Sequence, residues 1–86
     1  MVKKLTKVEL HYYAQLREAL HASREEVEIG LPATEMEILS ELAGRHPQHG
    51  KLIQASRLAV NDEYLPLGTV IRELSTADLI SPVSGG

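Results

Sequence analysis

An 86-residue chain without cysteine must be held together by its apolar core alone. The same absence excludes disulfides, thiolate metal sites, iron-sulfur clusters and cysteine nucleophiles. A domain of this size lies near the lower limit at which one core can stabilise a fold. Phe and Trp are also missing, so the 43% of hydrophobic residues must build the core mainly from Leu, Ile and Val. We predict a single domain over residues 1–86.

The formal net charge of -3 argues against a nucleic acid as partner. Proteins that bind a phosphate backbone concentrate Lys and Arg on one face. The only basic cluster, Lys3, Lys4 and Lys7, is interpreted as a solubilising feature that begins in an N-terminal arm over residues 1–6. No apolar run approaches the length of a membrane span or a signal core. We therefore expect a cytoplasmic protein that binds neither nucleic acid nor membranes.

Two segments in the first third of the chain alternate between apolar and polar residues, as half-buried strands do. The apolar positions are Val8, Leu10 and Tyr12 in the first segment and Val27, Ile29 and Leu31 in the second, over residues 26–31. Tyr13 falls on the polar side of the first strand. The stretch AQLREALHAS between the strands breaks the alternation and predicts a helical turn or loop.

One helix is predicted with a clear start and end. Thr34 followed by Glu37 fits a capping box, and Gly44 and Pro47 end the pattern. The apolar stripe at helical spacing consists of Met36, Ile38, Leu39, Leu42 and Ala43. Glu35, Glu37 and Glu41 are interpreted as a solvated helix face.

Short strands are predicted in the last third of the chain. Residues 58–60 form one, a tight turn at Asn61 and Asp62 returns into another, and Leu79 and Ile80 lie in the last. This order predicts an α+β domain of the β-grasp, or ubiquitin-like, class, in which one main helix packs across one face of a mixed sheet. In that topology the first and last strands pair in parallel at the centre of the sheet. The tail, residues 81–86, then leaves from an exposed end as a flexible Gly-Gly segment.

The internal residues offer no self-sufficient catalytic apparatus. The sequence contains no Gly-rich phosphate loop, nucleophile elbow or carboxylate dyad. His46 and His49 are spaced like a metal pair, but Pro47 separates them and no third ligand at a fixed spacing follows. Imidazoles at the end of a helix interact favourably with its dipole, which is the preferred interpretation. We expect no metal site and no bound cofactor.

The last residues of the sequence are the one segment that could take part in a reaction, through the terminal carboxylate. The α-carboxylate of a terminal glycine has a pKa of about 3.3 to 3.7, so at neutral pH it is ionised and a poor electrophile until a partner activates it, for instance as an acyl adenylate. A reactive acyl group must be shielded from water in a narrow channel. Gly85 and Gly86 lack side chains and suit such a channel.

Three stretches, YYAQLREAL, LAVNDEYLPL and LISPVSGG, resemble the small subunit of molybdopterin synthase, a sulfur carrier of the MoaD/ThiS-like β-grasp family, over nearly the whole chain. The resemblance implies that a partner similar to ubiquitin-activating enzymes uses ATP to adenylate Gly86, which then becomes a thiocarboxylate. It further implies that the carrier joins a large subunit, as a heterotetramer of two small and two large subunits. There it donates sulfur to cyclic pyranopterin monophosphate, and two transfers build the dithiolene that holds molybdenum.

The resemblance also assigns residues on this chain. Gly86 would be the carrier terminus and Gly85 its narrow neighbour. The partner-binding residues would be the tail Ser81, Pro82, Val83 and Ser84, the apolar docking residues Tyr13, Tyr64 and Ile80, and Arg17. Ordinary sheet packing is the alternative for the three apolar residues, and a plain surface ion pair is the alternative for Arg17.

The sequence departs from the family pattern in three places. Leu74 and Ser75 stand where a Gly-Asp turn usually precedes the last strand, His21 where a glycine often follows the first helical turn, and Ser81 where proline is frequent.

Two other functions stay open. The chain could serve as a thiamine-type sulfur carrier or ubiquitin-like protein modifier, or as a non-catalytic β-grasp interaction module.

Overall fold

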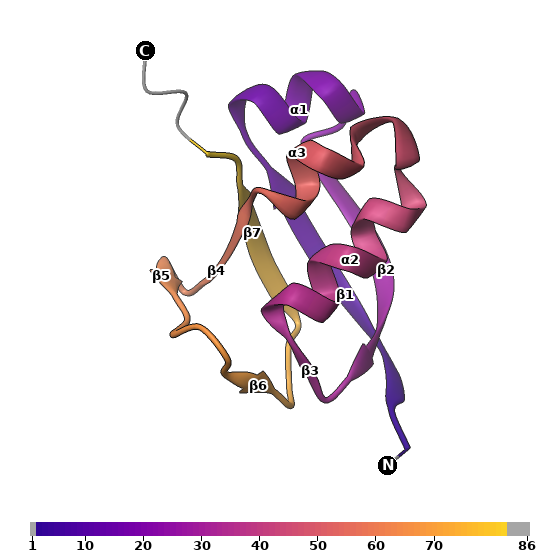
Figure 1. Ribbon diagram of the computed structural model, residues 1–86, viewed down its shortest axis with the longest axis vertical. Coiled ribbons are helices and arrows are strands. Elements are labelled where there is room, and N and C mark those ends of the chain that lie inside the picture. The colour runs from indigo at the N-terminus through magenta and orange to yellow at the C-terminus, as the bar shows by residue number, and fades with distance from the viewer. Residues whose placement is uncertain (1, 83–86) are drawn as a thin grey trace.

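A mixed sheet of five strands, in the order β2-β1-β7-β4-β5, forms the body of the protein. The computed structural model describes residues 2–82, and Figure 1 shows the arrangement. The elements are β1 (Lys4–Tyr12), α1 (Ala14–Leu20), β2 (Arg24–Leu31), β3 (Ala33–Thr34), α2 (Glu35–Arg45), the 3-10 turn η1 (Pro47–His49), α3 (Gly50–Gln54), β4 (Arg57–Val60), β5 (Glu63–Tyr64), β6 (Val70–Ile71) and β7 (Thr76–Ile80). A second sheet is formed by β3 and β6.

β1 and β7, which come first and last along the chain, lie side by side in the middle of the sheet, as the sequence predicted. β1 and β7 are parallel, with Tyr12 opposite Leu79, whereas β2 and β4 flank them in antiparallel orientation. Because β1 and β7 run in the same direction, the chain leaves β7 at the end of the sheet where Tyr13 leads into α1. Figure 1 shows this end opposite the N-terminus.

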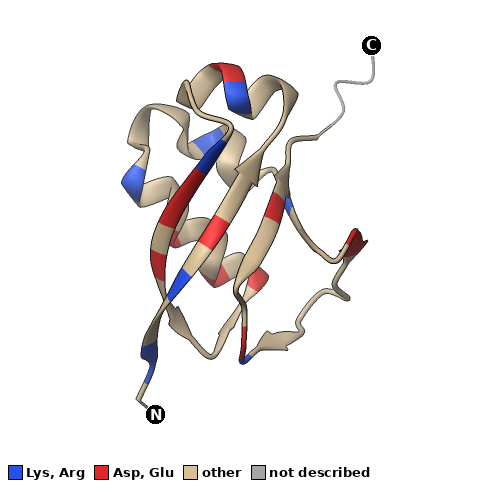
Figure 2. Cartoon of the chain, turned by 180° about the vertical axis from the view of Figure 1, so that it is seen from behind, with Lys and Arg blue, Asp and Glu red and all other residues tan. Residues whose placement is uncertain are grey.

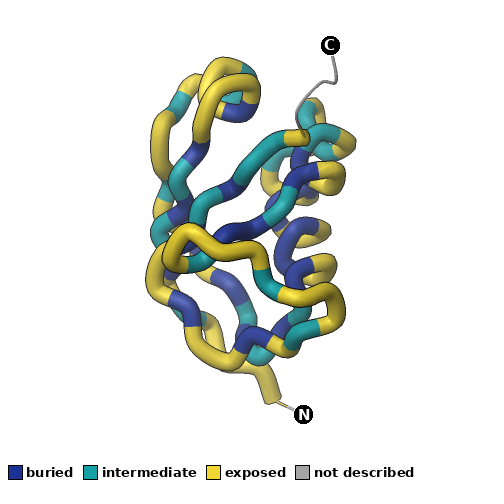
Figure 3. Tube along the Cα trace, turned by 90° about the vertical axis from the view of Figure 1, so that its left-hand side faces the viewer, coloured by how far each residue is buried: buried dark blue, intermediate teal, exposed yellow. Residues whose placement is uncertain are grey.

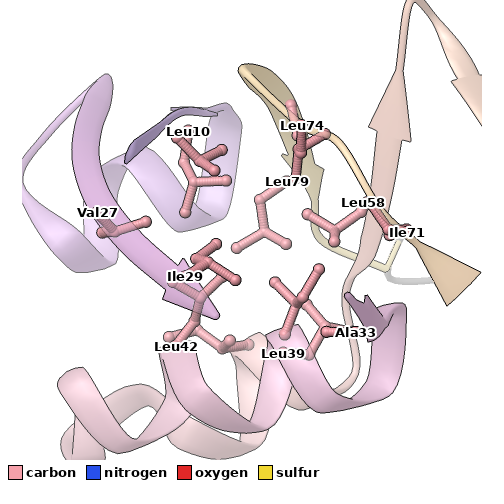
Figure 4. Packing of buried hydrophobic residues seen from close by; sticks show 14 of the residues in the cluster. Leu10, Val27, Ile29, Ala33, Leu39, Leu42, Leu58, Ile71, Leu74 and Leu79 are labelled. Atoms are coloured by element: carbon pink, nitrogen blue, oxygen red, sulfur yellow. The ribbon is translucent and has the colours of Figure 1, made fainter. Parts of the chain in front are cut away.

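One face of the sheet is covered by α2 and α3, and the core lies between these layers. Side chains that alternate along the central strands point into it, among them Leu10, Leu58 and Leu79, each 0% exposed. Figure 4 shows these residues packing against Ile29, Leu39 and Leu42, and the burial pattern along each strand is visible in Figure 3. Apolar burial of this kind is the main source of stability in a chain without covalent cross-links.

The predicted capping box is present at the start of α2. The Glu37 amide donates to Thr34 Oγ1 at 3.3 Å, and the Thr34 amide donates to Glu37 Oε1 at 2.8 Å. The prediction for Met36 was wrong, because this side chain is 78% exposed. Successive residues turn about 100° around a helix. The buried face of α2 is centred on Glu35, so Met36 points away from it.

The predicted N-terminal arm is shorter than residues 1–6. β1 begins at Lys4, which pairs with Leu31 of β2, so residues 4–6 belong to the sheet. Their backbone groups form hydrogen bonds with the antiparallel strand β2. The cluster of lysines gives no indication of this pairing, because the partner strand lies elsewhere in the sequence. No helix among residues 2–82 is long and apolar enough to cross a membrane.

The structure shows what occupies two of the three positions that depart from the family pattern. Leu74 is buried, at 7% exposed, and joins the core just before β7. The Ser75 carbonyl accepts a hydrogen bond from the Glu9 amide at 2.9 Å. His21 ends α1 with a φ of 54°, the left-handed conformation that glycine adopts most easily.

We expect His21→Gly to stabilise the protein by up to about 1 kcal/mol. A side chain in the left-handed region costs about 1 to 2 kcal/mol, which exceeds the extra entropy that glycine gives the unfolded chain. Urea unfolding measures the change. The matched variant His21→Ala removes the imidazole but keeps Cβ, so a similar gain in both variants would show that the backbone conformation is not the cause.

Candidate functional site

The sheet face opposite the helices carries the predicted docking residues. Tyr12, Leu79 and Leu58 stand in register across β1, β7 and β4, and all three side chains point into the core. Neighbouring residues on a strand point to opposite faces, so Tyr13 and Ile80 lie on the outer face. Tyr64 joins them there through its pairing with Ala59, which also pairs with Asp78. We call Tyr13, Tyr64, Asp78 and Ile80 the open-face patch.

Tyr13 is held at the edge of α1 by a contact that the sequence analysis did not anticipate. It precedes the first residue of the helix in an extended conformation, and its hydroxyl donates to Asp78 Oδ1 at 2.9 Å. This hydrogen bond, followed by partial desolvation and the negative charge of Asp78, raises the pKa of Tyr13 above its ordinary value. Its side chain stays 45% exposed.

The pKa of Tyr13 is expected to fall toward its ordinary value in the variant Asp78→Asn. An amide in place of the carboxylate removes the negative charge that disfavours the phenolate. A pH titration followed by NMR of the tyrosine ring carbons measures the shift. Glu73→Gln removes one charge from an exposed residue of the preceding loop and serves as control. An unchanged titration of Tyr13 in Asp78→Asn would contradict the hydrogen bond.

Tyr64 lies on the far side of the patch, after the turn that joins β4 to β5. Asn61 and Asp62 both have positive φ values, of 53° and 64°, as a tight hairpin turn requires. The turn prediction is therefore confirmed. The guanidinium carbon of Arg57 lies 5.0 Å from the centroid of the Tyr64 ring, which is 55% exposed. This distance is typical of a cation–π interaction.

The position of the Arg57 side chain is fixed by Glu35 of α2, a buried residue that is only 7% exposed. Nε of Arg57 donates to Glu35 Oε2 at 2.9 Å, and the Leu58 amide donates to the same oxygen at 2.8 Å. The interpretation of Glu35 as part of a solvated helix face was wrong. Glu35 occupies the centre of the buried face of α2, and a carboxylate can be buried there because it is paired and hydrogen-bonded.

The remaining assigned residues lie at the same end of the sheet. Arg17 is exposed on α1, one helical turn after Tyr13, and its side chain forms no hydrogen bond or ion pair within residues 2–82. Ser81 is half-buried and Pro82 is exposed, and both continue directly from β7. The predictions for Val83, Ser84, Gly85 and Gly86 fall outside the described residues.

The first of the two histidines that follow α2 has a side-chain partner on another element. His46 is the C-cap of α2, and its Nε2 lies 3.0 Å from Glu25 Oε1, which also accepts a hydrogen bond from the Tyr12 hydroxyl at 2.6 Å. Burial tends to raise the pKa of Glu25, but the hydrogen bonds from Tyr12 and His46 outweigh it and lower this pKa. Within residues 2–82, no group of three potential ligands is placed to hold a metal ion.

The outer face also presents carboxylates on neighbouring strands, as Figure 2 shows for β2, β1 and β7. Glu26 stands directly opposite Glu9, and Glu9 accepts a hydrogen bond from His11 Nε2 at 2.7 Å. The outer face therefore carries the open-face patch together with these carboxylates. The patch lies partly on β7, the strand that continues into Ser81 and Pro82. Accessible aromatic and aliphatic side chains beside charged groups are typical of surfaces that bind other proteins.

Two members of this arrangement, Asp78 and Arg57, were missed by the sequence analysis. Extending the alternation of the last strand back from Ile80 would have placed Asp78 on the same face. The Arg57–Glu35 contact joins residues 22 positions apart, and no local pattern indicates it.

Comparison with known proteins agrees with the fold. The model of the ThiS family matches residues 10–86. No curated protein shows a significant match. Among solved structures, a Pyrococcus furiosus protein provisionally named molybdopterin converting factor subunit 1 matches with a TM-score of 0.71 and 21% identity, covering 91% of this chain and 99% of its own.

Two further solved structures match over nearly the whole chain. SAMP1 from Haloferax volcanii matches with a TM-score of 0.69 and 27% identity, covering 94% of this chain and 100% of its own. Caldiarchaeum subterraneum ubiquitin has a TM-score of 0.63 and 17% identity, with 96% and 100% covered. The predicted β-grasp fold is confirmed.

Proposed function

The chain belongs to the ThiS family, and from this membership we propose that it is a sulfur carrier, the small subunit of a molybdopterin synthase. Gly86 is its working end, Gly85 is the narrow neighbour, and residues 81–84 form the segment that enters a partner. The observation that carries the proposal is the family match over residues 10–86, which includes the terminal glycines.

The carrier chemistry requires partners that act on the Gly86 carboxylate. An activating enzyme joins this carboxylate to the adenylyl group of ATP and releases pyrophosphate. A persulfide sulfur then displaces AMP, and a thiol that cleaves the resulting disulfide leaves a thiocarboxylate. In the large subunit the thiocarboxylate sulfur forms a carbon–sulfur bond to cyclic pyranopterin monophosphate while a carbon–oxygen bond of that substrate breaks, and hydrolysis of the acyl–sulfur bond returns the Gly86 carboxylate. Catalytic side chains reside on the partners.

The geometry of the described residues supports a carrier in two ways. β7 is central to the sheet and leads directly into Ser81 and Pro82, so the tail has a rigid root. The open-face patch lies beside this root. Ordering a threaded tail costs about 1 to 2 kcal/mol per residue in backbone entropy, and glycines have little surface to offset that cost. The body must supply the affinity, and this patch is placed to do so.

Ile80→Asp and Tyr13→Asp are each expected to weaken binding to both the activating enzyme and the large subunit by about 30-fold or more, the effect of losing an interface hot spot. A buried interface cannot solvate the new carboxylate. Calorimetric titration with each purified partner measures the affinities. Met36→Asp, on the helical side of the protein, is the control and should leave both affinities unchanged. Equal affinities for all variants would contradict a docking role for the patch.

Intact mass spectrometry of the cell-purified protein tests the carrier function directly. The expected result is a population in which one oxygen at Gly86 is replaced by sulfur.

The second candidate function, a protein modifier, is favoured by the match to SAMP1, a small archaeal modifier protein. Ladders of covalent conjugates on a denaturing gel, lost when Gly85 and Gly86 are deleted, would support the modifier. Full cofactor production without these two glycines would instead support a non-catalytic interaction module.

A further inference from the structure

Tyr64 belongs to a segment with few structural ties of its own. β5 is two residues long and pairs only with β4 within the part of the chain that the structure describes. After Leu65, which is half-buried and packs against the core, the chain follows a mostly exposed path toward β6, visible in Figure 3. Within that path the Pro66 carbonyl accepts hydrogen bonds from the Thr69 amide at 3.1 Å and the Thr69 hydroxyl at 2.6 Å, which are contacts local to the loop.

The Tyr64 ring lies against the side chain of Arg57. The guanidinium stacks over the ring at 5.0 Å, and its Nη2 donates to the Leu65 carbonyl at 3.0 Å. Arg57 therefore contacts both the aromatic side chain and the backbone that follows it. These two contacts restrict the ring and the direction in which the chain leaves β5.

Arg57 can place the ring because its own position is fixed at the other end. Glu35 accepts hydrogen bonds from Arg57 Nε at 2.9 Å and from the Leu58 amide at 2.8 Å. Glu35 is the first residue of α2 and is buried. A planar guanidinium presents its donors in a rigid fork, so a buried carboxylate on one side sets the direction of the donors on the other.

We propose that Arg57 is a positioning residue that holds Tyr64 in the orientation in which the open-face patch meets a partner protein. The inference rests on the proposed function, since it assigns a role within that docking patch. Preorganisation of a side chain in its bound orientation raises affinity because less freedom is lost on binding. Tyr64 remains 55% exposed, so the ring surface not covered by Arg57 is available to the partner.

A double-mutant cycle tests whether Arg57 acts through Tyr64. The dissociation constant for the purified large subunit is measured for the wild type, Arg57→Met, Tyr64→Ala and the double variant. We expect each single substitution to weaken binding about tenfold, and the double variant to bind within about twofold of Tyr64→Ala. Multiplication of the two single effects in the double variant would overturn the proposal.

A charge effect is separated by the matched control Arg72→Met. Arg72 is exposed and forms no hydrogen bond or ion pair within residues 2–82, so its loss should change affinity by less than about twofold. A loss as large as that of Arg57→Met would show that net charge is responsible and would overturn the positioning role. Arg57→Met also removes the cationic partner of the buried Glu35 carboxylate, which keeps the hydrogen bond from the Leu58 amide. The combined variant Glu35→Gln with Arg57→Met removes that charge and is expected to show the same loss of affinity.

A readout on the free protein keeps this inference separate from the proposed function. NMR relaxation of the Tyr64 ring carbons, without any partner, should show faster and wider motion in Arg57→Met and unchanged motion in Arg72→Met. An unchanged Tyr64 ring in Arg57→Met would overturn the inference. Failure of the wild type to bind the large subunit would instead contradict the proposed function, and the ring measurement would still decide the role of Arg57.

Discussion

Extension of the chain by one alanine after Gly86 is expected to lower sulfur transfer by at least about 100-fold, because errors of about 1 Å in placing a reacting group can have effects of that size. The Gly86 carboxylate becomes an amide that cannot be adenylated. The new carboxylate lies one residue further along, about 3.3 to 3.6 Å, and carries a methyl group next to it. Two obstacles therefore act together: a displaced reacting group and a side chain in a channel suited to glycine.

Thiocarboxylate formation by the activating enzyme and cofactor production by the complete system both measure this effect. An alanine added before Met1 provides the matched control and should leave both unchanged. Unfolding in urea should also be unchanged in the extended chain, since the core ends at Leu79 and the addition lies beyond it. A normal rate from a chain whose added alanine is shown by intact mass to be retained would refute the carrier mechanism.

Leu79→Ala is expected to destabilise the protein by about 2 to 5 kcal/mol. Leu79 is 0% exposed on the central strand β7, where it packs between the neighbouring strands and the helical layer. Small domains have a free energy of unfolding of about 5 to 15 kcal/mol, so the loss is a large part of the total. Because no disulfide limits the unfolded chain, no covalent link offsets this loss.

Ile80→Ala is the matched control for this prediction. Ile80 is the next residue along β7 and is half-buried on the outer face. We expect it to cost about 1 kcal/mol or less, as outward-facing residues typically do. Urea unfolding followed by circular dichroism gives both values. Equal destabilisation by the two variants would contradict the assignment of opposite faces to Leu79 and Ile80.

The parts of the fold that sequence patterns predict are those with local determinants. The alternation at Val8, Leu10 and Tyr12 gives both β1 and the face that it buries. The capping box at Thr34 and Glu37 marks the start of α2 to the residue. The order of the predicted elements correctly led to the β-grasp topology, and the alternation along the first strand correctly placed Tyr13 on the polar side.

The parts that escaped prediction depend on contacts between distant segments. Helical periodicity places position 35 at the centre of the buried face of α2, but a glutamate is not expected there from its polarity, because its partner Arg57 lies on another element. The two-residue strands β3 and β6 exist only as partners of each other. The sequence predicts only a helical turn or loop where α1 forms. A helix of seven residues is too short to be stable by propensity alone and needs tertiary packing, which Leu16 provides at 0% exposed.

The parallel pairing of β1 with β7 has a consequence for how the protein is made. β1 pairs with β7 late, because Tyr12 finds its partner Leu79 only after all the helices and strands between them have been synthesised. Sheets closed by such distant pairs form late. A nascent chain that stops before β7 lacks the centre of its sheet and stays a target for proteases. The sheet is therefore complete only in molecules whose translation has passed β7, the strand that leads into the tail.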